Sequence, residues 1–162
     1  MRGLLRSRAD QRGQSLVEFA LVLPIFLLVV TGLFDLARAV WQENTLAYAA
    51  REGTRYAIVH GSAGNPIAWP GSATATTCSN ASASPSCQPV FDAVTGAAIG
   101  VRNIAVTVTW PDPYPDGTTC YDRTCRVVVD ASAPFVPMPS QYLLGGAFQI
   151  TLRGGSQLYI QR

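Results

Sequence analysis

Apolar residues follow one another almost without interruption near the start of the chain. Residues 16–34 carry one charged side chain, Glu18, and are otherwise apolar or small, with a single threonine. As a helix rising about 1.5 Å per residue, this run measures about 28 Å, which matches the hydrocarbon core of a bilayer. It is apolar on all faces, whereas a helix of a soluble protein carries one apolar stripe. The pattern predicts a membrane-spanning helix, kinked at Pro24.

The helical pattern continues beyond the apolar run. In residues 35–59 apolar or small side chains recur about every 3.6 residues, and Gly53 is the sole helix-breaking residue. The sequence therefore predicts one long helix from about Ser15 to Val59, ended by Gly61 and Gly64. Its first half lies in lipid and its second half is an amphipathic extension outside it, together forming a segment 14–60. The recurring positions are Leu36, Ala39, Val40, Leu46, Ala47, Ala50, Ala57 and Ile58.

Charges on the two sides of the apolar run predict its orientation. Four arginines precede the run and are opposed only by Asp10, whereas three acids balance three arginines over residues 35–55. Positive flanks stay on the cytoplasmic side of a membrane. We therefore expect a single-pass protein with a cytoplasmic N-terminus and an extracytoplasmic C-terminal domain. The four arginines are Arg2, Arg6, Arg8 and Arg12.

The remainder of the chain predicts a small α+β domain. Residues 61–89 are rich in Gly, Ser, Ala, Thr and Pro and are expected to form a loop. In residues 90–162 we expect a short helix over about 89–99 closed by Gly100, a strand over 104–110, and a second strand over 126–135 broken by Pro134 and Pro137. A hairpin-like pair around Gly154 and Gly155 completes an antiparallel sheet, which the exported half of the long helix is expected to cover.

Composition and cysteine spacing narrow the function classes. Only 14% of residues are charged and the net charge is +2, with no basic cluster beyond the extreme N-terminus, so nucleic acid is not an expected partner. The cysteines form two close pairs, Cys78 with Cys87 and Cys120 with Cys125. Neither spacing is that of a zinc ribbon, so two local disulfides in an oxidising compartment are the preferred interpretation over a metal site or free thiols.

The polar residues offer no catalytic arrangement. His60 is the only histidine and stands at the predicted end of the helix. Asp112, Asp116 and Asp122 do not follow the alternating pattern of a calcium-binding EF-hand loop, and a turn built of Asp, Pro and Gly is the simpler interpretation. We therefore expect no enzyme activity, no cofactor and no metal.

One junction carries a recognisable motif. The sequence RGQSLVEFA, residues 12–20, places a glycine after the basic leader and one acid five residues later, at the start of the apolar run. A carboxylate in a membrane segment costs on the order of a few kcal/mol at the bilayer centre and less near the interface, which marks Glu18 as a functional candidate. The junction resembles the prepilin processing site of tight-adherence (Flp) pili.

The resemblance extends along the helix. EFALVLP (18–24), GLFDLAR (32–38) and AAREGTR (49–55) are similar to the TadE-like family of pseudopilins, and RVVVD (126–130), Pro134-Phe135 and FQITLR (148–153) are more loosely similar to their late strands. The resemblance implies a pilin-like fold and cleavage between Gly13 and Gln14 by a membrane peptidase, which removes a leader 1–13 and leaves Glu18 at the fifth mature position. Phe19 stands where major pilins of this system often carry Tyr, and this chain is much longer than the major pilin. Both facts favour a minor pseudopilin.

The implied partners are the bilayer of the bacterial cytoplasmic membrane, a prepilin peptidase, other pilin-like subunits and the pilus assembly platform. Two interpretations of Glu18 remain open. Its carboxylate pairs with the new α-amino group of a neighbouring helix, or it stays solvated near a helix N-terminus and is favoured by the helix dipole. The competing function is a secreted soluble binding protein, released by leader peptidase after Ala39 in the A-x-A-like site of residues 37–39.

Overall fold

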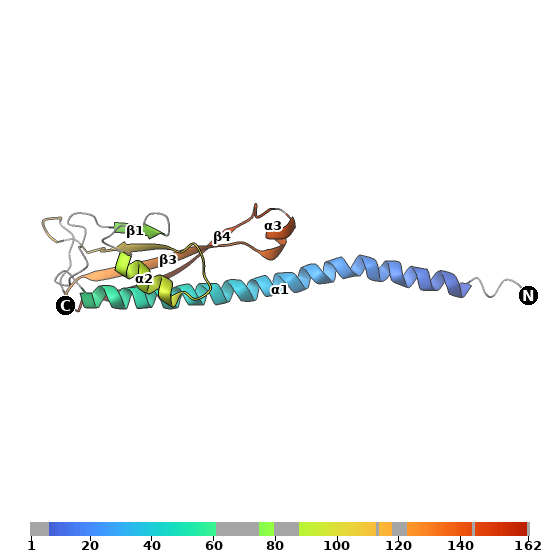
Figure 1. Cartoon of the computed structure of the whole chain (residues 1–162), viewed down its shortest axis with the longest axis horizontal. Helices are drawn as coiled ribbons and strands as arrows, with labels where there is room; N and C mark the ends of the chain where they lie inside the picture. Colours follow the sequence, from blue (N-terminus) through green and yellow to red (C-terminus); the bar gives the residue numbers. More distant parts are fainter. Residues whose placement is uncertain are drawn as a thin grey trace, which may run out of the picture. The chain divides into compact units, whose positions relative to one another are not determined.

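The structure is a computed structural model that describes residues 7–60, 75–79, 88–112, 114–117, 123–143 and 145–161. Of residues 7–12, 60, 75–79 and 143 it describes the backbone alone. Figure 1 shows the elements along the chain. They are α1 (Ser7–His60), β1 (Ala75–Ser79), α2 (Gln88–Ala97), β2 (Ala105–Thr109), β3 (Arg126–Phe135), α3 (Met138–Leu143) and β4 (Ile150–Tyr159).

The chain divides into two compact units. One consists of Met1–Arg38 with Val136–Phe148, and the other of Ala39–Phe135 with Gln149–Arg162. The first unit holds the apolar half of α1 together with α3. The second holds the rest of α1, α2 and the sheet, and we call it the sheet unit. Because α1 contributes to both, one continuous helix serves two different packing environments.

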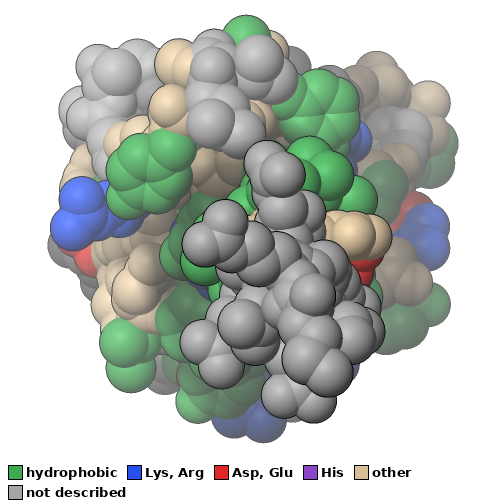
Figure 2. Space-filling model, turned by 90° about the vertical axis from the view of Figure 1, so that its right-hand side faces the viewer, with side chains coloured by type: hydrophobic (Ala, Val, Ile, Leu, Met, Phe, Trp, Pro, Cys, Tyr) green, Lys and Arg blue, Asp and Glu red, His purple; other side chains and the backbone are tan. Residues whose placement is uncertain are grey.

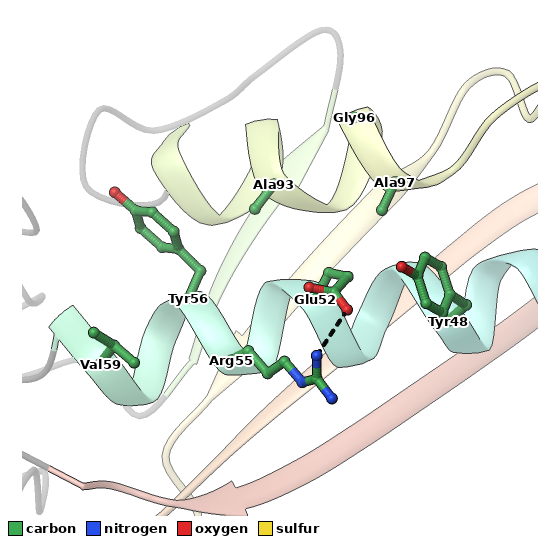
Figure 3. Close-up of a pocket in the computed structure, with 8 residues that line it drawn as sticks. All are labelled: Tyr48, Glu52, Arg55, Tyr56, Val59, Ala93, Gly96 and Ala97. Carbon is green, nitrogen blue, oxygen red and sulfur yellow. Dashed lines mark hydrogen bonds and ion pairs between the residues drawn. The ribbon is translucent and has the colours of Figure 1, made fainter.

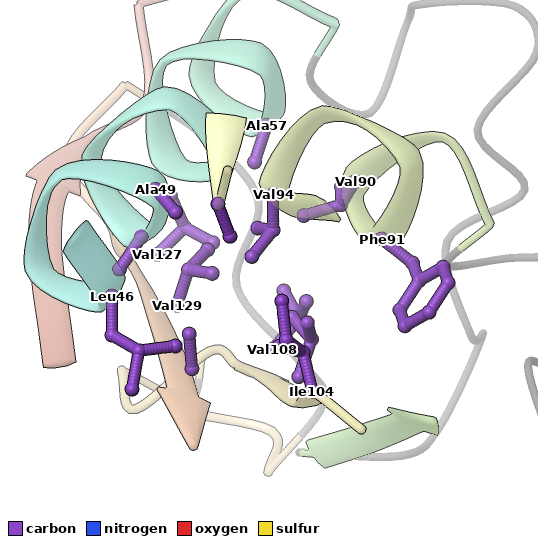
Figure 4. Close-up of a cluster of buried hydrophobic side chains, with 14 of the residues drawn as sticks. Leu46, Ala49, Ala57, Val90, Phe91, Val94, Ile104, Val108, Val127 and Val129 are labelled. Atoms are coloured by element: carbon purple, nitrogen blue, oxygen red, sulfur yellow. The ribbon is translucent and has the colours of Figure 1, made fainter. Parts of the chain in front are cut away.

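The sheet unit has the predicted α+β architecture. Its four strands follow the order β1-β2-β3-β4, and each neighbouring pair is antiparallel. Strand β3 alternates buried and less buried residues along its length, as expected for a strand with one face on a core. Its buried side chains meet those of β2 and of the two helices, α1 and α2 (Figure 4). The sheet thus presents one apolar face to α1 and α2.

Small side chains let α1 approach this sheet closely. Leu46, Ala49, Ala50 and Ala57 are fully buried on one face of α1 and recur at helical spacing. Next to them, a Cβ on Gly53 would overlap the side chain of Val94 in α2. The small-residue face predicted from the sequence is therefore confirmed, although Leu36 and Val40, counted in the same pattern, are at least half exposed.

Most predicted elements are confirmed. The structure contains the long helix, the short helix ending before Gly100 (φ 79°), and the strands at 105–109 and 126–135. The blue half of α1 is shallowly bent in Figure 1, as a proline inside a helix predicts. Helix α1 begins at Ser7 and not near Ser15. Pro134 does not break β3, because β2 pairs only up to Ser132 and the proline lies where β3 has one neighbour.

The prediction of a hairpin at Gly154 and Gly155 is wrong. Both glycines lie inside β4, which pairs with β3 over its whole length. A Cβ on Gly154 would overlap the backbone of Leu46 and Ala47 in α1. Glycine is needed there for the close approach of a strand to a helix and not for a turn.

Two elements were not foreseen. Strand β1 lies within the segment expected to be a loop and pairs with β2 on the edge of the sheet. The helix α3 connects β3 to β4 after two prolines. Short elements such as these take their structure from their neighbours, so periodicity does not reveal them.

Asp112 is hydrogen-bonded to Arg126 at one end of the sheet. Its carboxylate accepts hydrogen bonds from the Arg126 backbone N–H at 2.9 Å and from the guanidinium Nε at 3.0 Å and Nη2 at 2.7 Å. These bonds from Arg126 hold the pKa of Asp112 at about 2, below its ordinary value of 3.8. Asp112, which the sequence analysis placed in a turn, therefore has a specific partner in Arg126, the first residue of β3.

We expect Gly154→Ala to destabilise the sheet unit by at least about 2 kcal/mol, because the new methyl meets backbone atoms that have no rotamer to change. The matched control is Gly96→Ala in α2, where a Cβ meets none of the described atoms within 4 Å. There alanine is expected to stabilise the helix by about 0.5 kcal/mol. Thermal unfolding of the full chain in detergent, followed by circular dichroism, measures both. Equal melting temperatures for the two variants would contradict the packing argument.

The Asp112–Arg126 pair makes stability depend on pH. The pKa of Asp112 is lower in the folded chain, so the pair's stabilisation is present above pH 3.8 and is lost as pH falls through about 2. We expect Asp112→Asn to lower the melting temperature near neutral pH and to match the wild type near pH 2. A difference in melting temperature that persists unchanged down to pH 2 would mean that the charge of Asp112 is not the cause.

Candidate functional site

The apolar half of α1 exposes its side chains on all faces. Within residues 16–34 the large apolar side chains other than Val30 are 39% or more exposed, and Phe19 and Leu21 are more than 60% exposed. Figure 2 shows hydrophobic side chains, in green, at several places on the face that it draws. A candidate membrane-spanning stretch lies within Gly13–Val59, and its most apolar window is not buried at all. A core helix of a soluble protein buries such a stretch, so this one fits a single-pass membrane protein.

The predicted processing residues lie inside α1. Gly13 has no described atom within 4 Å of where a Cβ would be, and the Gly13–Gln14 bond is part of the helix. The side-chain amide of Gln14 donates to the Glu18 carboxylate at 3.2 Å, one turn further along. The structure therefore brings Gln14 and Glu18 together on one exposed helix face. Phe19 points away from any described core and is 65% exposed.

Thr31, the neutral polar side chain of residues 16–34, is hydrogen-bonded within the helix. The hydroxyl of Thr31 donates back to the carbonyls of Leu27 and Leu28 at 2.9 and 3.0 Å. In a hydrocarbon environment an unpaired hydroxyl is costly, and this bond to the preceding turn removes that cost. Glu18 is then the only ionisable group between Gly13 and Phe34.

A clamp of Asp35 and Arg38 lies at the C-terminal end of the apolar run. Asp35 is 7% exposed, and its Oδ2 accepts the backbone N–H of Met138 at 2.7 Å, at the first residue of α3. Arg38 donates from Nη2 to the carbonyl of Val136 at 2.5 Å and lies 3.8 Å from Oδ1 of Asp35. The two side chains hold the start of the α3 segment against α1.

The sequence analysis used these two residues as flanking charges and as part of the GLFDLAR motif, and it assigned them no structural contact. The sequence offered one signal for a shared role. Asp35 and Arg38 are three positions apart, so they share a helix face, and they follow directly after the apolar run. The burial of Asp35 could not be predicted from the sequence, because it depends on a segment that lies about a hundred residues further along the chain.

The sheet unit carries an open groove between α1 and α2, of about 530 Å³ (Figure 3). Two tyrosines, Tyr48 and Tyr56, line it with Ala93 and Gly96 from α2. The Glu52 carboxylate and the Arg55 guanidinium pair at 3.3 Å on its rim. Among the described residues no group of three or more His, Cys, Asp or Glu is placed to hold a metal ion.

The cysteines are described only in part. Cys125 is disulfide-bonded and buried. The backbone of Cys78 lies in β1 opposite Val106. Cys87, Cys120, Asp122 and the side chain of His60 fall outside the described residues. The pairing of Cys78 with Cys87 and of Cys120 with Cys125 stays a prediction.

Comparison with known proteins gives one match. The model of the family described as TadE-like protein matches residues 13–55, which begin at Gly13 and run through most of α1. No curated protein and no solved structure matches the chain. The family is a structural one associated with pili, which indicates a role related to the tight-adherence pilus. The resemblance seen in the sequence is therefore confirmed over residues 13–55.

Proposed function

We propose that the chain is a minor pseudopilin that takes part in assembly of a Flp-type pilus. A prepilin peptidase removes residues 1–13, residues 14–60 anchor the protein in the bacterial cytoplasmic membrane, and residues 90–162 fold on the extracytoplasmic side. The observation that carries the proposal is the start of the family match at Gly13, where the basic leader meets an exposed apolar helix. The protein is a substrate and a structural subunit in this role, not a catalyst.

The processing step has a physical basis in the position of Gly13. The bond to be cut lies within α1, and a peptidase binds an extended segment. Glycine lowers helix stability by about 1 kcal/mol relative to alanine, and terminal turns fray readily. The turns from Ser7 to Gly13 can therefore unwind at low cost and expose the Gly13–Gln14 bond at the membrane boundary.

Cleavage changes the environment of Glu18. In the uncut chain this residue lies about three turns inside α1, away from the helix N-terminus. After cleavage the helix begins at Gln14, so Glu18 lies close to the first turn, where the helix dipole favours a negative charge. The new α-amino group of Gln14 also adds a cation near the same membrane boundary. A carboxylate so placed suits pairing with the α-amino group of an adjacent subunit.

The secreted alternative conflicts with the Asp35–Arg38 clamp. Release after Ala39 would remove both residues that hold the α3 segment. It would also cut α1 where the helix is continuous. The remaining chain would expose an apolar segment without its partner, which is unfavourable for a soluble protein.

We expect the membrane-extracted protein to begin at Gln14, as measured by intact mass spectrometry after alkaline extraction in a host that carries the peptidase. Gly13→Val should retain the leader, because a branched side chain hinders access to the scissile bond. Gly32→Val, in the middle of the apolar run, serves as the control and should be cut normally. A soluble protein that begins at Val40 would establish the secreted alternative, and a membrane protein that retains Met1 would remove the prepilin interpretation.

Glu18→Gln separates the two roles of this carboxylate. Glutamine keeps the size and can still bond Gln14, but it removes the charge. If Glu18 pairs with a neighbouring α-amine, recovery of crosslinked pilin-like subunits should fall about tenfold, equivalent to about 1.4 kcal/mol, while cleavage continues. Glu43→Gln, exposed beyond the apolar run, is the control. Normal recovery with Glu18→Gln would leave the solvated-helix interpretation.

A further inference from the structure

A second apolar surface lies beside the membrane-spanning part of α1. A groove of about 530 Å³ is bounded by α1 on one side and by α3 on the other, and nearly all of its lining is apolar. The α1 wall consists of Pro24, Leu27, Leu28 and Thr31, and the α3 wall of Met138, Pro139 and Tyr142. All of these residues belong to one compact unit, Met1–Arg38 with Val136–Phe148.

We infer that the α3 segment, residues 136–148, is a second membrane element that lies in the outer leaflet, with phospholipid acyl chains filling the groove. This inference rests on the membrane-spanning role of α1 in the proposed function. It adds a monotopic contact to the single span, so that two separate parts of the chain meet the bilayer.

Depth along α1 supports this placement. The groove residues of α1 lie three to ten positions before Phe34, or between about 4 and about 15 Å from the outer end of the apolar run. Half of a bilayer's hydrocarbon core is about 15 Å thick, and interfacial segments insert about 5–10 Å. A segment packed on these residues is therefore at the depth of acyl chains.

The α3 segment is also suited to lipid by composition. Residues 131–152 contain no Asp, Glu, Lys, Arg or His, in a chain where 14% of residues are charged. Tyr142 is 79% exposed and Phe148 is 58% exposed, so large aromatic side chains face outward from the segment. Aromatic rings of this kind gather at the boundary between headgroups and hydrocarbon.

Several backbone groups of the segment are hydrogen-bonded within it. The Gln141 N–H donates to the Pro137 carbonyl and the Gly146 N–H to that of Ser140, both at 2.9 Å. The Ser140 hydroxyl accepts the N–H of Phe148 and donates to its carbonyl, both at 3.0 Å. Two glycines with positive φ, at 145 and 146, make the turn that closes this loop. Non-helical backbone enters the membrane boundary only with such partners.

The clamp fixes the segment at this depth. Asp35 accepts the N–H of Met138 and Arg38 holds the carbonyl of Val136, and both follow directly after the apolar run. The charged groups thus lie at the level of the headgroups, while the chain beyond them turns back along the apolar part of α1. A second copy of the chain would need matching side chains, whereas acyl chains adapt to a shallow groove whose walls are nearly all apolar.

A spin label at position 142 tests the inference on the full chain in vesicles of equal parts phosphatidylethanolamine and phosphatidylglycerol. Tyr142→Cys and Phe148→Cys carry the label at exposed positions, so neither substitution disturbs a described core. Leu21→Cys in the span is the lipid reference, and Gln157→Cys, exposed on β4, is the aqueous reference. The measurement is the ratio of collision rates with oxygen, which enters lipid, and with a water-soluble nickel chelate.

We expect this ratio at 142 and 148 to exceed the Gln157 value several-fold and to approach the Leu21 value. A ratio equal to that at Gln157 overturns the inference and leaves the anchor intact. Low accessibility to both reagents, with spin–spin broadening, assigns the groove to a second copy and also overturns it. An aqueous value at Leu21 itself removes the membrane span, and the proposed function fails together with the inference.

Discussion

A single helix must satisfy two solvents, and most of the structure follows from that constraint. Over residues 16–34 the side chains of α1 are exposed and apolar, which is stable in hydrocarbon but not in water. From Leu46 onward the same helix buries small residues against a sheet. Bilayer thickness limits the length of the first part, and the second part must leave room for strands to pack closely. The composition of α1 changes at Asp35 because its surroundings change there.

Close packing explains where sequence reasoning succeeded and where it failed in the sheet unit. The face of α1 and the alternation in β3 both repeat with a fixed period, so they could be predicted from one sequence. The role of Gly154 could not be predicted, because in sequence a glycine that admits a neighbouring backbone looks the same as one that makes a turn. Deciding between them requires Leu46 and Ala47, which lie more than a hundred residues earlier.

The candidate site was predictable to a similar extent. Gly13, Gln14 and Glu18 lie together in sequence, so their motif is visible, and the hydrogen bond between Gln14 and Glu18 follows from i, i+4 spacing. Asp35 and Arg38 act on residues 136–138, and no local pattern connects them. Charge counting used them only to orient the helix, whereas the structure buries Asp35 against the N–H that begins α3. Contacts between residues close in sequence can therefore be predicted from the sequence, whereas partners far apart in the chain cannot.

The clamp gives the end of the apolar run a structural role in the fold. Asp35 is the first charged residue after the apolar run, and it accepts a backbone N–H that water would otherwise bond. That bond reduces the cost of desolvating this carboxylate, and so does Arg38, which lies 3.8 Å from its Oδ1 and also binds the carbonyl of Val136. The Met138 N–H and the Val136 carbonyl both belong to the connection between β3 and β4, so this connection is attached to the end of the apolar run. The residues that mark where the run ends therefore also hold the α3 segment beside it.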